Sequence, residues 1–341
     1  MKISFVCERK STYGGKEKYF SKLVTFCKEK NLNIEEIYSP FPKIIPGWLR
    51  VILFNIYLFL IKKNSFFFSL EKIINADIYR AGDGVHKYFF NHFKKSKINI
   101  FHYINIFLEK KCMNNSKHII ANSIMTKKQI IEIYGIDENK ISLVYNGVDK
   151  EEANPYKIES IRKELELSNC KVILFVGSGY KRKGVKEFLY ILSQLSFKNF
   201  KALVVGKEKN MSFYKSYSEK LGLGSKVHFI GPSVNVAEFY EVSDIFLFPT
   251  HYEPFGFVVL EAMHHGNAII TTKKCGASEV LKNEYVMKSP SDPRVVNELD
   301  NLLDNEKLLG EIKRKNKEIA KKYSLQRNFN ETLKVINKHI N

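Results

Sequence analysis

Residues 171–184 read KVILFVGSGYKRKG, a short apolar run that leads directly into a loop rich in glycine and positive charge. Continuous apolar runs of this length, rich in Val, Ile and Phe, are typical of strands buried on both faces of a parallel sheet. Glycine in the loop after such a strand allows a tight turn into the helical stretch that follows. The stretch therefore predicts the first strand and loop of an α/β domain.

The same alternation of short apolar runs and longer helical stretches extends in both directions from this segment. Predicted strands after it cover residues 202–206, 227–230, 245–249 and 268–272, and those before it cover residues 3–7, 34–38, 77–80, 118–122 and 141–145. After residue 293 the sequence reads as successive amphipathic helices, the last over residues 326–340. The predicted fold class is α/β with two parallel sheets.

Two sets of predicted strands indicate two domains, and so does the length of 341 residues, which exceeds that of one ordinary core. The turn-forming residues 146–149 (NGVD) and the polar stretch up to Pro155 separate the two sets. The predicted domains therefore cover residues 1–150 and 151–323.

Composition limits the class of protein. Hydrophobic residues make up 44% and charged residues 27% of the chain, which is typical of a folded globular protein and excludes a disordered one. The five cysteines are widely spaced and form no Cys-x-x-Cys pair, as expected in a reducing cytosol. Residues 1–7 enter an apolar strand without the pattern of a signal peptide, so a cytoplasmic location is expected.

The net charge of +19 is unevenly distributed. Residues 1–150 carry 25 Lys and Arg against 13 Asp and Glu, whereas residues 151–341 carry a net charge of +7. A positive field favours an anionic partner, such as a nucleic acid, an anionic membrane or an acidic substrate, but a genome that favours Lys, Ile, Asn and Phe explains it equally well. The basic residues form no recognisable nucleic-acid reading motif, so no nucleic-acid partner is predicted.

Two segments raise the question of membrane contact. Residues 48–61 are almost continuously apolar but too short to span a bilayer, and a buried helix of the first domain is favoured over an interfacial one. Residues 87–111 mix phenylalanines with lysines, among them Lys94, Lys95 and Lys97, and suit a lipid-facing surface better. A buried face with a solvated basic side explains this second segment equally well.

The strongest functional signal is EPFGFVVLE at residues 253–261, which follows a predicted strand and leads into an apolar helix. Ligands of open parallel sheets bind beyond the carboxyl ends of the strands, and a helix start offers unpaired N–H groups to a phosphate. The backbone of Phe255, Gly256 and Phe257 is therefore a candidate phosphate-binding element. Glu253 and Glu261 are candidates for accepting hydrogen bonds from sugar and ribose hydroxyls.

The loop 177–184 supplies the complementary charge. A diphosphate leaving group gains negative charge as its bond to a sugar breaks, and fixed Arg or Lys groups can stabilise it without a metal ion. Gly177, Arg182 and Lys183 are the candidates for this role. A basic loop taken alone is more often solvated surface, so the prediction depends on the position of this loop directly after a strand.

Together, the basic loop and the Glu-x(7)-Glu element resemble the signature of the family-4 retaining glycosyltransferases in order and spacing. The resemblance covers the second half of the chain and is strongest to lipopolysaccharide core glucosyltransferases, through residues 177–185 (GSGYKRKGV), 227–229 (VHF) and 271–276 (TTKKCG). It implies the GT-B fold, in which two Rossmann-like domains with parallel sheets face an interdomain cleft. It also implies that the last helix, residues 324–341, packs back on the first domain.

In the first half, the resemblance assigns roles to two loops. Gly14 and Gly15 follow the first predicted strand and open a helix, where the family has a Gly-Gly loop against the donor phosphate. Asp83 and His86 lie in a glycine-rich loop after the strand at 77–80 and resemble the family's acceptor-side loop. Asp83 would accept a hydrogen bond from the acceptor hydroxyl or oppose charge on the anomeric carbon, and His86 would bond a donor-sugar oxygen.

The resemblance implies a retaining, metal-independent hexosyltransferase with a nucleotide sugar, expected to be UDP-linked, as its donor and with no cofactor. The expected acceptor is a lipopolysaccharide or lipooligosaccharide core, which the basic first domain would meet at the inner face of the cytoplasmic membrane. The alternatives are a related transferase for capsule, exopolysaccharide or glycolipid, and a catalytically silent scaffold that binds nucleotide sugars. His264 and His265 lack a third ligand at helical spacing, so a surface or capping role is expected rather than a metal site.

Overall fold

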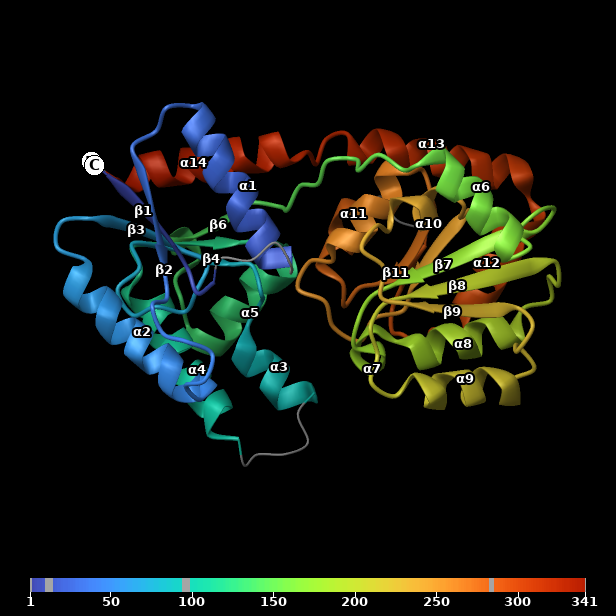
Figure 1. Cartoon of the computed structure of the whole chain (residues 1–341), viewed down its shortest axis with the longest axis horizontal. Helices are drawn as coiled ribbons and strands as arrows, with labels where there is room; N and C mark the ends of the chain where they lie inside the picture. Colours follow the sequence, from blue (N-terminus) through green and yellow to red (C-terminus); the bar gives the residue numbers. More distant parts are fainter. Residues whose placement is uncertain (1, 10–14, 94–98, 282–284, 341) are drawn as a thin grey trace. The chain divides into compact units, whose positions relative to one another are not determined.

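The computed structural model describes residues 2–9, 15–93, 99–281 and 285–340. Gly14, Lys94, Lys95 and Lys97, which the sequence analysis singles out, lie outside the described residues. The chain forms two compact units, drawn in Figure 1. Unit 1 comprises residues 1–146 and 325–341, and unit 2 comprises residues 147–324.

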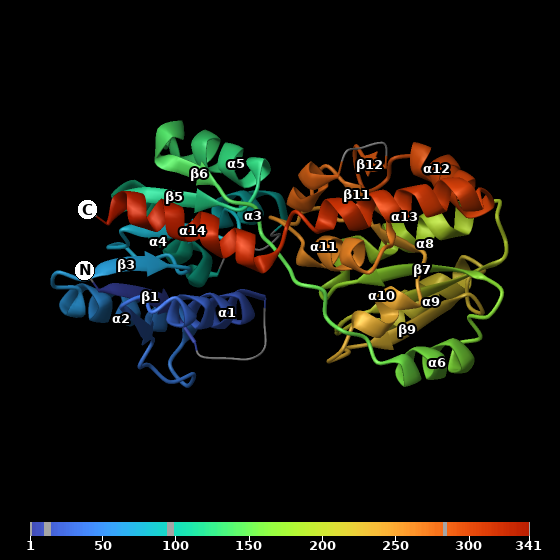
Figure 2. The same ribbon diagram turned by 90° about the horizontal axis from the view of Figure 1, so that it is seen from above.

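Within its described residues, unit 1 contains a six-stranded parallel sheet in the order β2-β1-β3-β4-β5-β6. In Figure 2, strands β6, β5, β3 and β1 follow one another in this unit from top to bottom. The strands are β1 (Ile3–Cys7), β2 (Ile34–Tyr38), β3 (Phe66–Ser69), β4 (Ile78–Ala81), β5 (His118–Ala121) and β6 (Ile141–Leu143). The helices are α1 (Gly15–Glu29), α2 (Gly47–Ile61), α3 (His86–Phe93), α4 (Ile100–Asn115), α5 (Ile124–Tyr134), the 3-10 turn η1 (Glu138–Lys140) and α14 (Leu325–His339).

Strand β3 is absent from the strands that the sequence predicts, although it occupies the centre of the sheet between β1 and β4. All four of its residues are buried. The run is only four residues long and follows closely on the apolar α2, so no change of hydrophobic period marks its start. Its position matters for function because the carboxyl ends of β1 and β3 meet where the strand order reverses.

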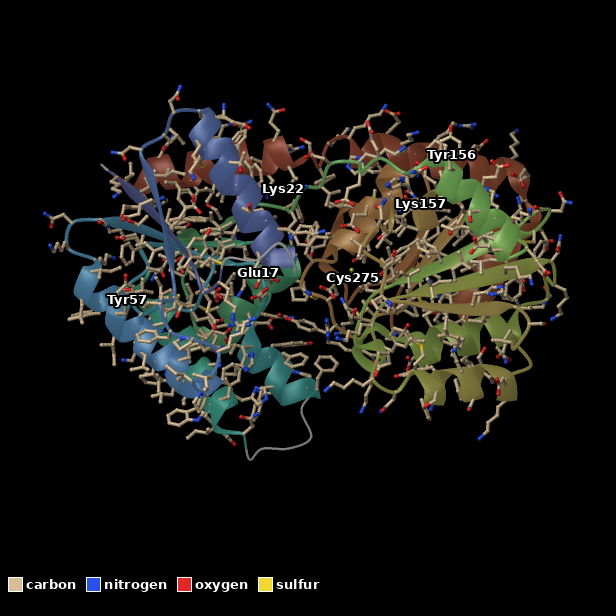
Figure 3. All side chains as sticks on the ribbon, viewed as in Figure 1. Glu17, Lys22, Tyr57, Tyr156, Lys157 and Cys275 are labelled. Atoms are coloured by element: carbon tan, nitrogen blue, oxygen red, sulfur yellow. The ribbon has the colours of Figure 1, made fainter. Side chains whose placement is uncertain are left out.

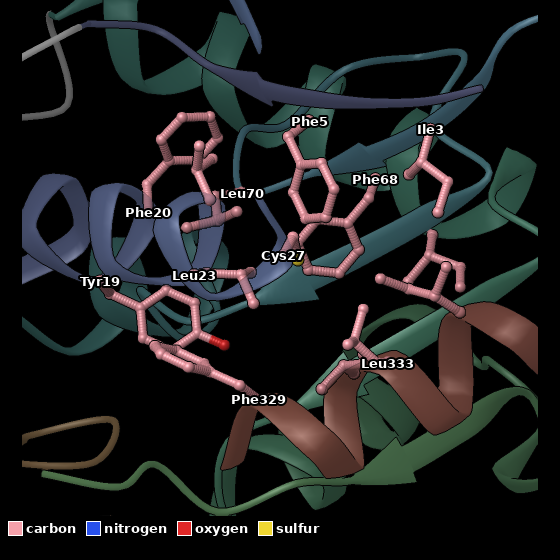
Figure 4. Packing of buried hydrophobic residues seen from close by; sticks show 14 of the residues in the cluster. Ile3, Phe5, Tyr19, Phe20, Leu23, Cys27, Phe68, Leu70, Phe329 and Leu333 are labelled. Atoms are coloured by element: carbon pink, nitrogen blue, oxygen red, sulfur yellow. The ribbon is translucent and has the colours of Figure 1, made fainter. Parts of the chain in front are cut away.

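The core of unit 1 joins segments from both ends of the chain. Side chains of α1, β1 and β3 pack with those of α14, as Figure 4 shows for Tyr19, Leu23, Phe329 and Leu333. The rings of Tyr19 and Phe329 lie 5.5 Å apart at an edge-to-face angle, and the Tyr19 hydroxyl donates to Asn328 Oδ1 at 2.9 Å. The last helix is therefore an integral part of the first sheet's covering layer.

Helix α2 departs from the buried helix that the sequence analysis favours. Of its residues, only Phe54 and Leu58 are buried, while Ile56, Phe59 and Leu60 are 53%, 74% and 71% exposed. Apart from Arg50 and Asn55 the helix consists of apolar residues and Gly47, but the protein covers only one side of it. The prediction of burial is wrong for the outer face of this helix.

Unit 2 contains the second parallel sheet, whose order over the described residues is β12-β11-β10-β7-β8-β9 (Figure 2). Its strands are β7 (Lys171–Val176), β8 (Phe200–Val205), β9 (Val227–Gly231), β10 (Ile245–Phe248), β11 (Ala268–Thr272) and β12 (Val286–Met287). Its helices are α6 (Pro155–Glu164), α7 (Tyr180–Lys183), α8 (Val185–Gln194), α9 (Met211–Lys220), α10 (Ala237–Glu241), α11 (Phe257–His264), η2 (Gly276–Val280), α12 (Arg294–Asp304) and α13 (Glu306–Ala320). The predicted α/β class with two parallel sheets is confirmed.

Candidate functional site

The strand order of unit 2 creates a crevice at the carboxyl ends of β7 and β10. From β7 the chain continues to β8 on one side, and from β9 it returns to β10 on the other side of β7. Loops that leave two such neighbouring strands diverge, and ligands of doubly wound sheets bind between them. Residues 177–184 follow β7 and residues 249–256 follow β10, so both predicted donor-binding loops begin at this crevice.

The two loops approach each other so closely that glycine is required at the crossing. Gly184 has a left-handed backbone with φ of 82°, and a Cβ atom built on it would lie 1.9 Å from the carbonyl oxygen of Pro249. No other residue fits there without a shift of the backbone. The close approach brings the short helix α7, which carries the basic residues, against the start of the β10 loop.

Arg182 connects the two loops through both its backbone and its side chain. Its carbonyl oxygen accepts hydrogen bonds from the N–H of His251 at 3.0 Å and from the hydroxyl of Thr250 at 3.2 Å. Its Nη1 donates to the carbonyl oxygen of Tyr252 at 2.7 Å and to Glu253 Oε2 at 3.1 Å. The guanidinium is thereby fixed in orientation, although its side chain remains 34% exposed.

Lys183 lies deeper and pairs with the same carboxylate. Its Nζ contacts Glu253 Oε2 and stands 5.2 Å from the centre of the Phe248 ring, and the side chains of Lys183 and Glu253 are 12% and 16% exposed. Burial, together with the adjacent Arg182 guanidinium, lowers the pKa of Lys183 from 10.5 to about 7. The contact with Glu253 opposes this shift. Arg182 and Lys183 are thus both fixed on one carboxylate, and burial favours the neutral form of the lysine.

The turn after Glu253 is held in place by residues that follow β11. Gly256 has φ of 96°, and a Cβ atom on it would lie 2.9 Å from Cys275 Sγ. The thiol of Cys275, labelled in Figure 3, donates to the carbonyl oxygen of Phe255 at 3.1 Å, and the N–H of Gly276 donates to the carbonyl oxygen of Glu253 at 2.9 Å. Helix α11 starts at Phe257, so its first N–H groups follow directly on this fixed turn.

Glu261 lies in α11 and accepts a hydrogen bond from the Tyr240 hydroxyl at 2.9 Å. Burial and the neighbouring Glu261 carboxylate raise the pKa of Tyr240 well above its usual value, which keeps this hydroxyl a donor. One carboxylate oxygen is therefore positioned by a buried phenol from α10. This tyrosine was not predicted as part of the site, and its position before β10 gave no signal of it.

In unit 1, the carboxyl ends of β1 and β3 hold a second group of charged side chains. Lys16, in the first turn of α1, lies 2.8 Å from Glu71 Oε1 and 3.5 Å from Asp83 Oδ2. Glu71 follows β3 and also accepts from the N–H of Glu8 at 3.0 Å. Burial disfavours the Lys16 ammonium, but the two carboxylates outweigh this effect and raise its pKa. Of the three, Asp83 is the most exposed, at 54%.

Lys16 and Glu71 are not among the predicted site residues, because the position of Glu71 follows only from the presence of β3. Of the predicted glycine pair, Gly15 is the first residue of α1. His86 begins α3, and its Nε2 lies 3.0 Å from Nδ1 of His102 while its N–H donates to the buried Glu109 at 2.8 Å. The structure thus brings Asp83 to Lys16 and His86 to a second histidine.

Of the expected surface or capping role of His264 and His265, capping is correct for His265, which is the C-cap residue of α11, but its side chain is only 2% exposed and does not lie on the surface. Its Nδ1 lies 2.8 Å from Glu241 Oε1, and its ring stacks on that of Tyr240. Among the residues that the structure describes, no group of three or more His, Cys, Asp or Glu side chains is arranged to hold a metal ion.

Two family profiles match the chain. The profile described as "Glycosyl transferases group 1" matches residues 157–322, and that described as "Glycosyltransferase Family 4" matches residues 75–152. Together they cover more than half of the chain and include every described candidate site residue except Gly15. The chain belongs to these glycosyltransferases.

Relatives by sequence include two bacterial glycosyltransferases. The lipopolysaccharide glucosyltransferase WaaG of Escherichia coli is 28% identical over 189 residues, which are 51% of this chain and 50% of that protein. The N,N'-diacetylbacillosaminyl-diphospho-undecaprenol α-1,3-N-acetylgalactosaminyltransferase of Campylobacter jejuni is 31% identical over 183 residues, which are 51% of this chain and 48% of that protein. The aligned part of this glycosyltransferase thus spans about half the length of these relatives.

Solved structures similar to this glycosyltransferase extend over nearly all of the chain. The crystal structure of WaaG superposes with a TM-score of 0.81 at 19% identity and covers 98% of this chain and 99% of that chain. The Anabaena protein HepE in complex with UDP-glucose superposes with a TM-score of 0.74 at 17% identity and covers 99% of this chain and all of that chain. The GT-B fold expected from the sequence is confirmed.

Proposed function

We propose that this glycosyltransferase moves a hexose from a UDP-sugar to a lipopolysaccharide or lipooligosaccharide core, with retention of configuration at the anomeric carbon. One observation carries the proposal: Arg182 and Lys183 converge on Glu253 at the crevice between β7 and β10. A nucleoside diphosphate needs fixed cations at such a crevice, and a sugar needs a carboxylate beside them.

In the proposed reaction the acceptor hydroxyl oxygen forms a bond to the anomeric carbon as the bond from that carbon to the β-phosphate oxygen breaks. The proton of the hydroxyl passes to the departing diphosphate on the same face, so no covalent intermediate is required. Arg182 and Lys183 stabilise the charge that develops on the diphosphate, as a bound metal ion does in other enzymes. Glu253 orients the sugar, and Glu261 accepts from the ribose hydroxyls.

The remaining assignments are part of the same proposal. Phe255, Gly256 and Phe257 offer backbone N–H groups to the phosphates, Gly177 lines the loop beside Lys183, and the turn at Gly15 approaches the diphosphate. Asp83 and His86 act on the acceptor and on the donor sugar. The UDP-glucose bound to HepE and the lipopolysaccharide acceptor in the name of WaaG support the choice of substrates. The cysteines of the described residues are free, which suits a reaction in the cytoplasm.

Thermal unfolding with a panel of nucleotide sugars tests the donor. UDP and UDP-hexoses are expected to stabilise unit 2 by about 2 to 3 kcal/mol at a hundredfold excess over their dissociation constants. GDP- and ADP-sugars are expected to give smaller shifts at the same concentration. Turnover is then measured with the stabilising donor and two acceptors, a truncated lipopolysaccharide core and an undecaprenyl-diphosphate glycan, and the anomeric configuration of the product is read by NMR.

Each result bears on a separate part of the proposal. If no nucleotide sugar shifts the unfolding transition, the transferase function is wrong for this chain. If UDP-hexoses bind but only the undecaprenyl-linked glycan is extended, the acceptor assignment is wrong. Binding without turnover on any acceptor favours the silent scaffold that the sequence left as an alternative.

Binding of UDP-glucose is expected to take up a proton near neutral pH. Burial and Arg182 lower the pKa of Lys183 to about 7 in the empty site, and a bound diphosphate raises it again by favouring the ammonium. Affinity is therefore highest below pH 7 and falls as the pH rises above 7, by up to about tenfold per unit. Calorimetry in buffers of different ionisation enthalpy measures the uptake, and UDP-glucose is used because its diphosphate diester does not titrate in this range. A Lys183→Met variant that takes up the same proton would contradict the assignment.

A further inference from the structure

Helices α2 and α4 of unit 1 form an exposed apolar surface, which we call the α2/α4 face. It comprises Trp48, Ile56, Phe59 and Leu60 of α2 and Ile100, Tyr103 and Phe107 of α4, all at least 36% exposed. The two helices pack against each other in the same unit (Figure 1). Large apolar side chains that gather on a water-facing surface mark a binding surface, whereas isolated ones do not.

The spacing of these residues gives each helix an exposed apolar stripe. Ile56, Phe59 and Leu60 repeat at intervals of three and four along α2, and Ile100, Tyr103 and Phe107 do so along α4. Such spacing places each set on one side of its helix. A surface helix of a globular protein normally turns its polar side outward. Both helices here turn apolar residues outward, although their buried sides are already filled.

A groove runs between the two helices. Its volume is about 600 Å3, and its lining includes Ile52, Ile56, Phe59, Tyr103 and Phe107. The side chains of Asn55, Asn75 and Tyr103 are the polar ones in the lining, and both amides donate to backbone: Asn55 to the Val51 oxygen at 2.9 Å and Asn75 to the Leu58 oxygen at 3.1 Å. The groove therefore offers a mostly apolar binding surface to a hydrocarbon chain.

Charge at the border of the face decides which partner fits it. Lys63 directly after α2, and Lys110 and Lys111 near the end of α4, are exposed. Helix α2 contains no Asp or Glu, and the single acid of α4, Glu109, is completely buried and accepts the N–H groups of His86 and Lys87. The exposed border is thus basic, and neither helix supplies an exposed carboxylate to neutralise it.

We propose that the α2/α4 face docks this chain on an anionic lipid bilayer, with the groove receiving a lipid hydrocarbon chain. Apolar side chains enter the boundary between headgroups and acyl chains, the lysines contact anionic headgroups, and Trp48 lies at the level that indole rings prefer. No described helix is long and apolar enough to cross a membrane. A second copy of the chain fits less well, because a symmetric pair would bring the same lysines together without opposing carboxylates.

Sedimentation with lipid vesicles tests this proposal without any nucleotide or acceptor, so it stands or falls independently of the proposed reaction. The full chain is expected to bind vesicles of phosphatidylcholine with 30% phosphatidylglycerol about tenfold or more tightly than pure phosphatidylcholine vesicles. Phe59→Glu and Phe107→Glu are each expected to weaken binding to the anionic vesicles by about tenfold or more, since they place a charge in the apolar boundary. Lys110→Gln with Lys111→Gln is expected to reduce the preference for anionic vesicles by about fivefold per lysine.

Phe213→Glu is the matched control, because Phe213 is 54% exposed on α9 of unit 2 and lies outside the face. It is expected to leave vesicle binding unchanged. Circular dichroism of each variant checks that it is folded. Vesicle binding that Phe59→Glu and Phe107→Glu do not reduce would overturn the proposal. So would a dimer in solution, detected by light scattering, that Phe59→Glu dissociates, since the face would then be an interface between copies.

Discussion

Replacing Lys183 by alanine is expected to lower kcat by about 10²- to 10³-fold and to weaken UDP binding by about tenfold or more. The loss is large because Lys183 is fixed and almost completely buried, with its Nζ on Glu253 and against the Phe248 ring. A fixed cation in dry surroundings stabilises a developing negative charge far better than a mobile one in water. Steady-state kinetics and UDP calorimetry measure the two effects.

Lys181→Ala is the matched control for this prediction. Lys181 lies in the same short helix α7, two residues away, but its side chain is exposed and belongs to the solvated surface. The substitution is expected to change neither kcat nor UDP affinity by more than about twofold. Equal losses from Lys181→Ala and Lys183→Ala would show that the loop contributes only a diffuse positive field, and the proposed contact with the diphosphate would be wrong.

Glu253→Gln separates charge neutralisation from sugar binding at the same site. The carboxylate now holds both Arg182 and Lys183, so it competes with a diphosphate for the same two cations. Removal of its charge is expected to leave UDP affinity equal or higher, while turnover falls by about 10²-fold because the neutral amide keeps only one acceptor oxygen, which accepts from the sugar more weakly than a carboxylate. Weaker UDP binding by Glu253→Gln would contradict this division of roles.

The sequence predicts the strands of unit 2 well because each is a single apolar run bounded by glycine, proline or polar residues. Strands β7 to β11 lie within two residues of their predicted limits. The two-residue β12 is missed because so short a run has no measurable period, and β3 is missed because it follows closely on the apolar α2 without a change of hydrophobic pattern. Glu71 is missed for the same reason, because its place beside Lys16 depends on β3.

Tertiary neighbours account for what the sequence could not predict. The apolar run of α2 indicates a helix, but whether its outer side is covered depends on which elements surround it, and the structure leaves Phe59 and Leu60 exposed. Arg182 and Glu253 are far apart in sequence, and the strand order around β7 and β10 brings them together. The carbonyl oxygen of Tyr252, which accepts from Arg182, could not be predicted because a backbone group has no signature in the sequence.

Gly184→Ala is expected to lower the free energy of unfolding of unit 2 by about 4 kcal/mol or more. A left-handed backbone costs a non-glycine residue about 1 to 2 kcal/mol. The larger part comes from the new Cβ atom, which would lie 1.9 Å from the carbonyl oxygen of Pro249 and can be accommodated only if backbone moves. Denaturant titration followed by far-ultraviolet circular dichroism measures the loss, while fluorescence of Trp48, the single tryptophan, reports on unit 1.

Gly222→Ala distinguishes the two contributions. Gly222 lies in the same unit with a similar φ of 73°, but nothing lies within 4 Å of a Cβ atom placed on it. Its substitution is expected to lower the free energy of unfolding by only about 1 to 2 kcal/mol, which is the cost of a left-handed backbone in a non-glycine residue. If both substitutions lower the free energy of unfolding by the same amount, the loops after β7 and β10 do not approach each other as closely as the structure shows. If Gly184→Ala loses more stability and also binds UDP more weakly, the contact between Gly184 and Pro249 also holds the adjacent Lys183 in position for the diphosphate.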